Sequence, residues 1–219
     1  MDPNPERLSR TLWVGVGLVI VILCVAFVLS RLKPAGRQRA PKLPVIAQVS
    51  DFVLTNQSGQ TVTLTNLIGQ IWVADIIFTR CPGPCPRMTK QMQSLQNALP
   101  SDRPVRLVTL TSDPEFDTPD VLQRYADRFG MDARRWLFLT GAKSQIASLA
   151  IDGLKLTAIE KQPAQRENVD DLFIHSTAFV LVDRQARLRA VFETGGEDVD
   201  WNKTREALLQ SIQQLEREP

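Results

Sequence analysis

The residues best suited to chemistry in this chain are two cysteines separated by three residues. Cys81 and Cys85 lie in the stretch FTRCPGPCPRM, between an apolar run and a helical pattern. Such a pair can form a disulfide, bind a metal ion, or alternate between the two states. The spacing alone does not choose among these, but its place between a buried strand and a helix favours a functional pair.

The prolines around the cysteines predict where each sulfur lies. Pro86 directly follows Cys85, which predicts Cys85 as the N-cap of a helix that opens with proline. Pro82 and Pro84 cannot lie inside a helix, so Cys81 is predicted in the preceding loop. The free N–H groups and the dipole of a helix N-terminus are then expected to favour the thiolate form of both sulfurs.

A third candidate ligand is His175, the only histidine of the chain, in DLFIHSTAFVLVD. Two thiolates do not complete a structural zinc site, which has four protein ligands. His175 precedes a predicted strand, near the sheet edge where the cysteine loop is expected. Two sulfurs and one imidazole suit Cu(I) at low coordination number, and Cu(II) with an added ligand. A lone histidine is more often structural than a ligand, so this ligand set is a hypothesis at this point.

The composition describes one globular domain with an appendage. The chain has 219 residues, of which 43% are hydrophobic, and a formal net charge of +2. This charge balance does not indicate a nucleic acid partner. Three cysteines are also too few for a scaffold held together by disulfides.

The N-terminal part predicts a membrane anchor. After a tail at residues 1–10, residues 11–30 read TLWVGVGLVIVILCVAFVLS without a charge, the length that crosses ~30 Å of hydrocarbon. A signal peptide would have a shorter apolar region, roughly 7–15 residues, and a small-residue cleavage site. We therefore predict an uncleaved single-pass helix, in which Cys24 has no role. Residues 31–44, RLKPAGRQRAPKLP, are a basic, proline-containing tether.

Flanking charge argues for a cytoplasmic C-terminal domain, because more basic residues follow the predicted anchor than precede it. This rule is weakest where a long folded domain follows the helix. The charge pattern alone therefore leaves the orientation open.

Residues 45–219 predict an α/β sandwich of the thioredoxin kind, because strands alternate with helices before a final hairpin and helix. In chain order the predicted elements are an N-terminal hairpin of VIAQVSDFVLTN and QTVTLTN, a buried strand IWVADIIFT, a helix at 86–98, a buried strand VRLVTLTS, a helix capped by Thr118 that ends near residue 130, a strand WLFLTG, a helix opening at Ser144, a long polar loop TAIEKQPAQRENVDD, a hairpin of FVLVD and LRAVFETG, and a closing helix at 200–216.

Together these stretches resemble the Sco/SenC family of membrane-anchored copper proteins. The resemblance covers residues 52–192 and rests on FVLTNQSGQTVTL, the cysteine motif, TSDPEFDTPDVL, WLFLTG and HSTAFVLVD. It implies a thioredoxin-like fold, with metal ligands at Cys81, Cys85 and His175. The chain departs from the family at Ile174, where an acid is common, at Asp75 within the strand before the motif, and at the stiff Gly83-Pro84 pair.

The family resemblance implies a copper chaperone, which is not strictly an enzyme. Such a protein receives copper from an upstream donor and delivers it to the dinuclear site of cytochrome c oxidase subunit II. The alternative is a metal-independent thiol-disulfide reductase that keeps the cysteines of that subunit reduced, with Cys81 and Cys85 as its redox pair and an upstream thiol reductant. His175 favours the copper role, since dithiol exchange needs no imidazole. A peroxidase is disfavoured, because peroxiredoxins usually have threonine where this chain has Phe78.

The resemblance also implies a domain that faces the periplasm or the intermembrane space. The N-terminus MDPNPERLSR is short and carries two acids, unlike a transit peptide. We therefore predict a bacterial inner-membrane protein whose domain faces the periplasm. The acidic segment around Asp113 and Glu115 is either a partner-docking surface or only a turn that starts a helix.

Overall fold

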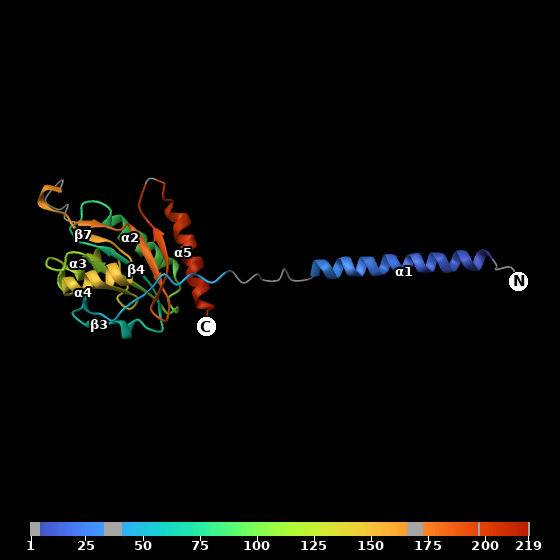
Figure 1. The fold of residues 1–219 in the computed structure, drawn as a ribbon, viewed down its shortest axis with the longest axis horizontal. Coiled ribbons are helices and arrows are strands. Elements are labelled where there is room, and N and C mark those ends of the chain that lie inside the picture. Colours follow the sequence, from blue (N-terminus) through green and yellow to red (C-terminus); the bar gives the residue numbers. More distant parts are fainter. Residues whose placement is uncertain (1–4, 33–40, 166–172, 197, 219) are drawn as a thin grey trace. The chain divides into compact units, whose positions relative to one another are not determined.

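The computed structural model describes the backbone of residues 5–32, 41–165, 173–196 and 198–218 (Figure 1). Within these ranges, the side chains of residues 5–12, 29–32, 158–160, 163 and 173–175 lie outside the description. The chain divides into two compact units, Met1–Pro41 and Lys42–Pro219. Each unit is described by itself.

The described part of the first unit, residues 5–32 and 41, contains the helix α1, Pro5–Leu32. A search of the described residues finds no helix whose length and apolar character would let it cross a membrane. The anchor predicted at residues 11–30 therefore stays a prediction.

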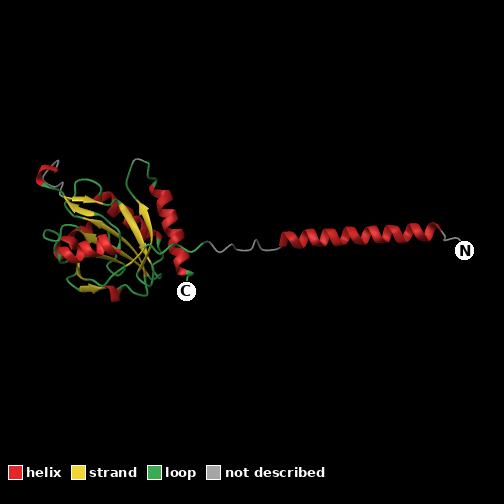
Figure 2. Ribbon diagram, viewed as in Figure 1, coloured by secondary structure: helices red, strands yellow, loops and turns green. Residues whose placement is uncertain are grey.

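The second unit is built on an eight-stranded sheet with the order β1-β10-β9-β4-β5-β6-β2-β3. Figure 2 shows strands in yellow and helices in red. Its strands are β1 Ala47–Gln48, β2 Val53–Asn56, β3 Thr61–Thr63, β4 Ile71–Ile77, β5 Val105–Thr111, β6 Trp136–Thr140, β9 Ala178–Val182 and β10 Arg187–Glu193. The strands β4, β5 and β6 are parallel, while β9 is antiparallel to β4. A separate ribbon pairs β7, Ala158–Glu160, with β8, Phe173–His175.

The helices of this unit are α2 Cys85–Ala98, α3 Pro119–Arg128, α4 Lys143–Ala147, which continues as a π-helical segment Ser148–Gly153, and α5 Trp201–Glu216. Short 3-10 turns lie at Leu64–Asn66 and Pro163–Gln165.

The core has two layers because successive side chains of β4 point to opposite faces of the sheet. Val73 and Ile77 pack on one face with side chains of α2, α3 and α5. Trp72 and Ile76 pack on the other face with the α4 region and the N-terminal loops. Asp75 is two residues from both Val73 and Ile77 in the strand, so its side chain points to the same face, the one that α2 covers.

The central elements confirm the sequence predictions. The strand before the cysteines is buried at all seven positions. The turn of the first hairpin contains Gly59 at φ 76°, and β2 pairs with β3. The last helix has Asp200 as its N-cap, whose carboxylate accepts from the N–H groups of Asn202 and Lys203.

Several boundaries differ from the predictions. The run VIAQVSDFVLTN forms two strands, β1 and β2, in different parts of the sheet, because β1 pairs with β10 and β2 with β3 and β6. The helix predicted to open at Ser144 begins at Lys143. Thr118 is the N-cap of α3 but makes no side-chain capping hydrogen bond. The predicted polar loop contains β7 and a 3-10 turn, and its residues 166–171 lie outside the described residues.

Candidate cysteine centre

Cys81 and Cys85 lie together where β4 gives way to α2, as the motif predicts. Both are buried thiols that form no disulfide, and the side chain of Cys85 is fully enclosed. Their side chains share a hydrogen bond. Cys85 is the first residue of α2 and Pro84 is the N-cap, so the predicted N-cap position of Cys85 is wrong by one residue. The local architecture nevertheless brings the two sulfurs into direct contact.

Burial raises the pKa of the Cys85 thiol well above its ordinary value. The hydrogen bond and charge of Cys81, and the charge of Asp75, raise this pKa further, while a backbone hydrogen bond from Phe78 lowers it. The expectation of a thiolate favoured by the helix N-terminus is therefore wrong for Cys85, because desolvation outweighs it. Without a metal ion, the reduced Cys85 is a neutral thiol.

A polar cluster that the sequence pattern indicated only weakly lies around α2. Asp75 is fully buried in β4, and its charge contributes to raising the pKa values of Cys85 and Tyr125. The Tyr125 hydroxyl lies 2.9 Å from Thr89 Oγ1. The Thr89 hydroxyl also donates to the Cys85 carbonyl at 3.0 Å. The acid that interrupts the apolar strand thus lies within electrostatic reach of the cysteine pair.

The backbone before Cys81 is held by Asp117. Its carboxylate accepts hydrogen bonds from the Thr79 amide at 3.1 Å, from the Thr79 hydroxyl and from the Thr111 hydroxyl. Burial raises the pKa of Asp117 although these hydrogen bonds lower it. The segment after β5 therefore positions the start of the cysteine loop through one buried carboxylate.

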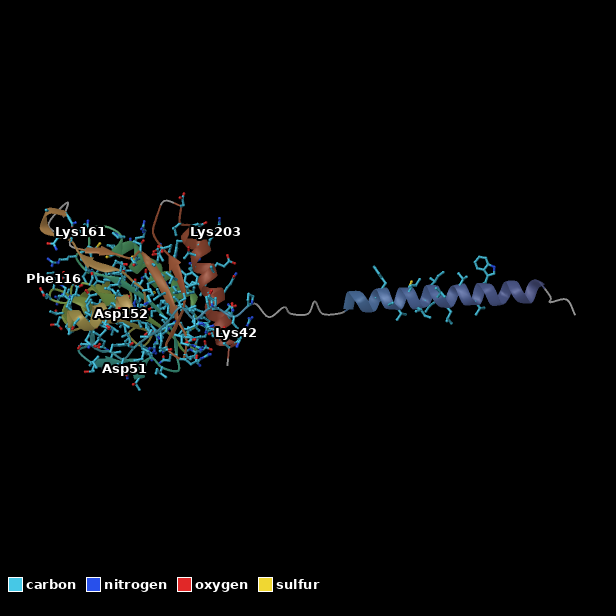
Figure 3. All side chains as sticks on the ribbon, viewed as in Figure 1. Lys42, Asp51, Phe116, Asp152, Lys161 and Lys203 are labelled. Atoms are coloured by element: carbon cyan, nitrogen blue, oxygen red, sulfur yellow. The ribbon has the colours of Figure 1, made fainter. Side chains whose placement is uncertain are left out.

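Arg80, next to Cys81, is bound by the same segment. Its Nε and Nη2 donate to Asp113 Oδ2 at 2.9 and 2.8 Å, and its guanidinium carbon lies 4.5 Å from the ring centroid of Phe116. Asp113 is buried, whereas Glu115 and Phe116 are exposed, and Phe116 is labelled at the surface in Figure 3. Asp113 therefore has an intramolecular role, and the docking hypothesis remains only for Glu115.

The backbone of His175 ends β8, and its side chain lies outside the described residues. Its position follows from β9, which runs antiparallel to β4 with Val182 opposite Trp72 and Val180 opposite Ala74. The start of β9 thus lies beside the end of β4 from which the cysteine loop leaves. The topology brings His175 and both cysteines to one end of the sheet. Among the described side chains, no group of three metal-ligating residues is found.

The segment after His175 is tied to the helix that carries Cys85. The Thr177 carbonyl accepts from the Thr194 amide at 2.7 Å, and the Thr194 carbonyl accepts from Gln91 Nε2 of α2 at 3.1 Å. A Cβ at Gly195 would lie 2.7 Å from Thr177 and 2.9 Å from Arg87, so only glycine fits there. These contacts couple the histidine segment to α2.

Comparison with known proteins identifies the family. The SCO1/SenC family model matches residues 42–210. A SCO1 protein homolog of Bacillus subtilis is 36% identical over 168 residues, covering 76% of this chain and 79% of the relative. The chain therefore belongs to the SCO1/SenC family.

Two solved structures show the same fold. One is BsSco, a member of the Sco family of cytochrome c oxidase assembly proteins for which a disulfide switch is described. It is 28% identical, with a TM-score of 0.63 over 78% of this chain and 98% of its own. The other is Bradyrhizobium japonicum ScoI with copper bound, at 23% identity and a TM-score of 0.61 over 75% of this chain and 99% of its own. The predicted thioredoxin-like α/β fold is that of these proteins.

Proposed function

We propose that this member of the SCO1/SenC family handles copper for the assembly of cytochrome c oxidase, with Cys81, Cys85 and His175 as the copper ligands. The observation that carries the proposal is the buried, reduced cysteine pair, whose side chains share a hydrogen bond. Sulfur ligands in this number select Cu(I) over harder cations. The copper-bound ScoI structure and the oxidase-assembly role of the BsSco family support the same ion and pathway.

The cysteine centre suits an ion that is carried as cargo. Binding of Cu(I) releases the thiol protons, and the positive charge of the ion compensates the thiolates in a site where burial disfavours them. Oxidation of the pair to a disulfide removes two electrons and two protons and leaves no thiolate for the metal. The redox state of the pair would therefore gate copper loading, as a disulfide switch requires.

The proposed recipient is the dinuclear copper site of subunit II, and the proposed location is the periplasmic face of a bacterial inner membrane, with residues 11–30 as the anchor. The uncharged stretch at residues 11–30 and the family resemblance support this arrangement. Fusions of alkaline phosphatase and of green fluorescent protein to the C-terminus test the orientation. A fluorescent fusion with an inactive phosphatase would refute it.

A second candidate is a thiol-disulfide reductase that acts on the cysteines of subunit II, since the reduced, hydrogen-bonded pair is the starting state for both functions. Both functions need the two cysteines, but only copper transfer needs the imidazole. We expect His175→Ala to reduce an oxidised C-x-x-x-C peptide within a few-fold of the parent rate and to fail to restore oxidase in cells that lack the protein. Full restoration by His175→Ala, with none by Cys81→Ser, would favour the reductase.

A further inference from the structure

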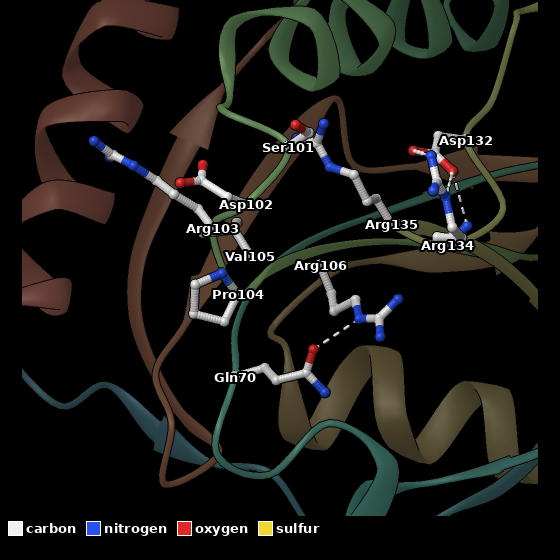
Figure 4. A pocket seen from close by; sticks show the side chains of 10 residues that line it. All are labelled: Gln70, Ser101, Asp102, Arg103, Pro104, Val105, Arg106, Asp132, Arg134 and Arg135. Atoms are coloured by element: carbon white, nitrogen blue, oxygen red, sulfur yellow. Dashed lines mark hydrogen bonds and ion pairs between the residues drawn. The ribbon is translucent and has the colours of Figure 1, made fainter.

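A cleft of about 470 Å³ lies at the end of the sheet opposite the cysteines. Its lining residues lie where β4, β5 and β6 begin. The cysteine loop leaves the other end of β4, a strand of seven residues that is roughly 20 Å long. Figure 4 shows the ten lining side chains, among which are four arginines, Arg103, Arg106, Arg134 and Arg135. We refer to this site as the arginine cleft.

Two of these arginines are already neutralised by carboxylates. Arg103 donates to Glu216 at 3.0 Å, and Arg134 pairs with Asp132 at 3.2 Å. They contribute little net positive charge to the arginine cleft.

The other two are held by neutral acceptors. Arg106 Nε donates to the amide oxygen of Gln70 at 2.7 Å, and Arg135 Nη2 donates to the carbonyls of Gln96 and Leu99 at 3.3 and 3.0 Å. Neither has a carboxylate partner in the part of the chain that the structure describes. Two carboxylates, Asp102 and Asp132, also line the cleft, and the charge of Arg135 helps to lower the pKa of Asp132, but neither carboxylate hydrogen-bonds to Arg106 or Arg135 among the described residues.

The same two side chains also have unused donors. Arg106 uses only Nε in its hydrogen bond to Gln70, so its two terminal nitrogens face the cleft region without an acceptor among the described residues. Arg135 makes its hydrogen bonds through Nη2, which leaves its other terminal nitrogen for a ligand, while its Nε is buried without a hydrogen-bond partner there. A guanidinium presents a planar fork of donors that matches the oxygens of a phosphate group. The geometry points to the arginine cleft as a binding site for a phosphate group, contacted by Arg106 and Arg135.

The position of the cleft indicates one source of such a group. Arg103 of the cleft contacts Glu216 at the end of α5, and two residues later Glu218 contacts Arg189, whose guanidinium also donates to the carbonyls of Leu43 and Pro44. The tether thus joins the domain beside the arginine cleft. This favours the phosphate of an anionic lipid headgroup over a free phosphate, a preference that rests on the proposed anchor.

The test uses residues 42–219, a compact unit that contains both core clusters and lacks the anchor segment. One arm titrates inorganic phosphate at low salt and follows backbone amide shifts by NMR. The other arm sediments the fragment with vesicles of phosphatidylglycerol and phosphatidylcholine, or of phosphatidylcholine alone. Saturable amide shifts at residues 103–106 and 132–135 support a free phosphate, and sedimentation only with phosphatidylglycerol supports the headgroup.

In either arm we expect Arg106→Gln to weaken binding by about tenfold, since it removes a charge-assisted contact. Arg134→Gln is the matched control, because it removes one formal charge from the same cleft at a residue already paired with Asp132, and it should weaken binding less than about twofold. Arg106→Lys keeps the charge without the fork and should give an intermediate affinity, which covers the case that Arg106→Gln does not fold. Absence of binding in both arms, or equal losses in Arg106→Gln and Arg134→Gln, would overturn the inference.

Discussion

The two ends of the central sheet hold their buried carboxylates in opposite ways. At the cysteine end, Asp117 accepts hydrogen bonds from two threonines, and burial raises its pKa. At the arginine end, burial also acts to raise the pKa of Asp183, but hydrogen bonds from the Arg187 backbone and from the Arg189 and Arg187 side chains outweigh it and hold this pKa below its ordinary value. Arginine side chains thus hold Asp183 at one end, whereas Asp117 at the other end accepts from neutral donors.

This difference explains the state of the sulfurs. The nearest arginine in sequence, Arg80, is occupied by Asp113, so its charge is largely neutralised. Burial and the nearby Asp75 then raise the pKa of Cys85. Burial therefore disfavours a thiolate at Cys85 unless a cation such as Cu(I) compensates it.

The largest effect should come from the cysteines. Cys81→Ser or Cys85→Ser removes one of two soft ligands, so Cu(I) affinity in the full chain should fall by more than about a hundredfold, measured by competition with a colorimetric Cu(I) chelator. Cys24→Ser is the control and should bind as the parent does. If both Cys81→Ser and Cys85→Ser bind Cu(I) as tightly as the parent does, the cysteines are not the copper ligands.

Removal of Asp117 should cost stability at the cysteine end. Asp117→Ala leaves the Thr79 amide and two hydroxyls without their acceptor, and we expect a loss of about 2–3 kcal/mol in the free energy of unfolding. Urea denaturation measures this loss. Asp127→Ala, at an exposed position on α3, is the control and should change stability by less than about 0.5 kcal/mol. Equal losses would argue against the proposed role of Asp117.

The same two aspartates should give stability opposite dependences on pH. The folded pKa of Asp117 is raised, so its contribution is present below 3.8 and is lost as pH rises through the folded pKa. The folded pKa of Asp183 is lowered, so its contribution is present above 3.8 and is lost as pH falls through the folded pKa. Urea unfolding of Asp117→Asn and Asp183→Asn across the acid range should show differences from the parent that change with opposite signs. If the two differences in unfolding free energy change with pH in the same direction, the opposite pKa shifts of Asp117 and Asp183 are contradicted.

The smallest effect should come from Arg80. Its ion pair with Asp113 is partly exposed, and its contact with Phe116 is a surface cation–π interaction. Arg80→Ala should therefore lower the free energy of unfolding by about 0.5–1.5 kcal/mol in urea denaturation. Arg124→Ala, exposed on α3, should be neutral. A loss as large as that of Asp117→Ala would mean that Arg80 contributes more to the loop than its exposure suggests.

Local patterns predicted the elements but not the electrostatics of the site. The apolar run of β4, the proline after Cys85 and the stripe containing Leu208 and Ile212 are visible along the chain, and the strand and helices they predict are present. The pKa of Cys85 could not be predicted in this way, because it depends on how deeply packing encloses the sulfur. The N–H groups of the helix N-terminus are only the local part of the environment that sets this pKa.

The arginine cleft was equally invisible in the sequence. Its lining comes from three separated segments, at residues 70, 101–106 and 132–135, which only the parallel pairing of the strands brings together. The contacts of Asp117 with Thr79 likewise join segments 38 residues apart. Asp75 was the one signal that could be read from the sequence, since an acid inside an apolar strand requires a reason.

The most direct test of the account is X-ray absorption at the copper edge of the reduced full chain loaded with one equivalent of Cu(I). We predict two sulfur ligands and one nitrogen ligand in the parent, and loss of the nitrogen with both sulfurs retained in His175→Ala. An unchanged spectrum in His175→Ala, or a copper site without two sulfur ligands in the parent, would contradict it.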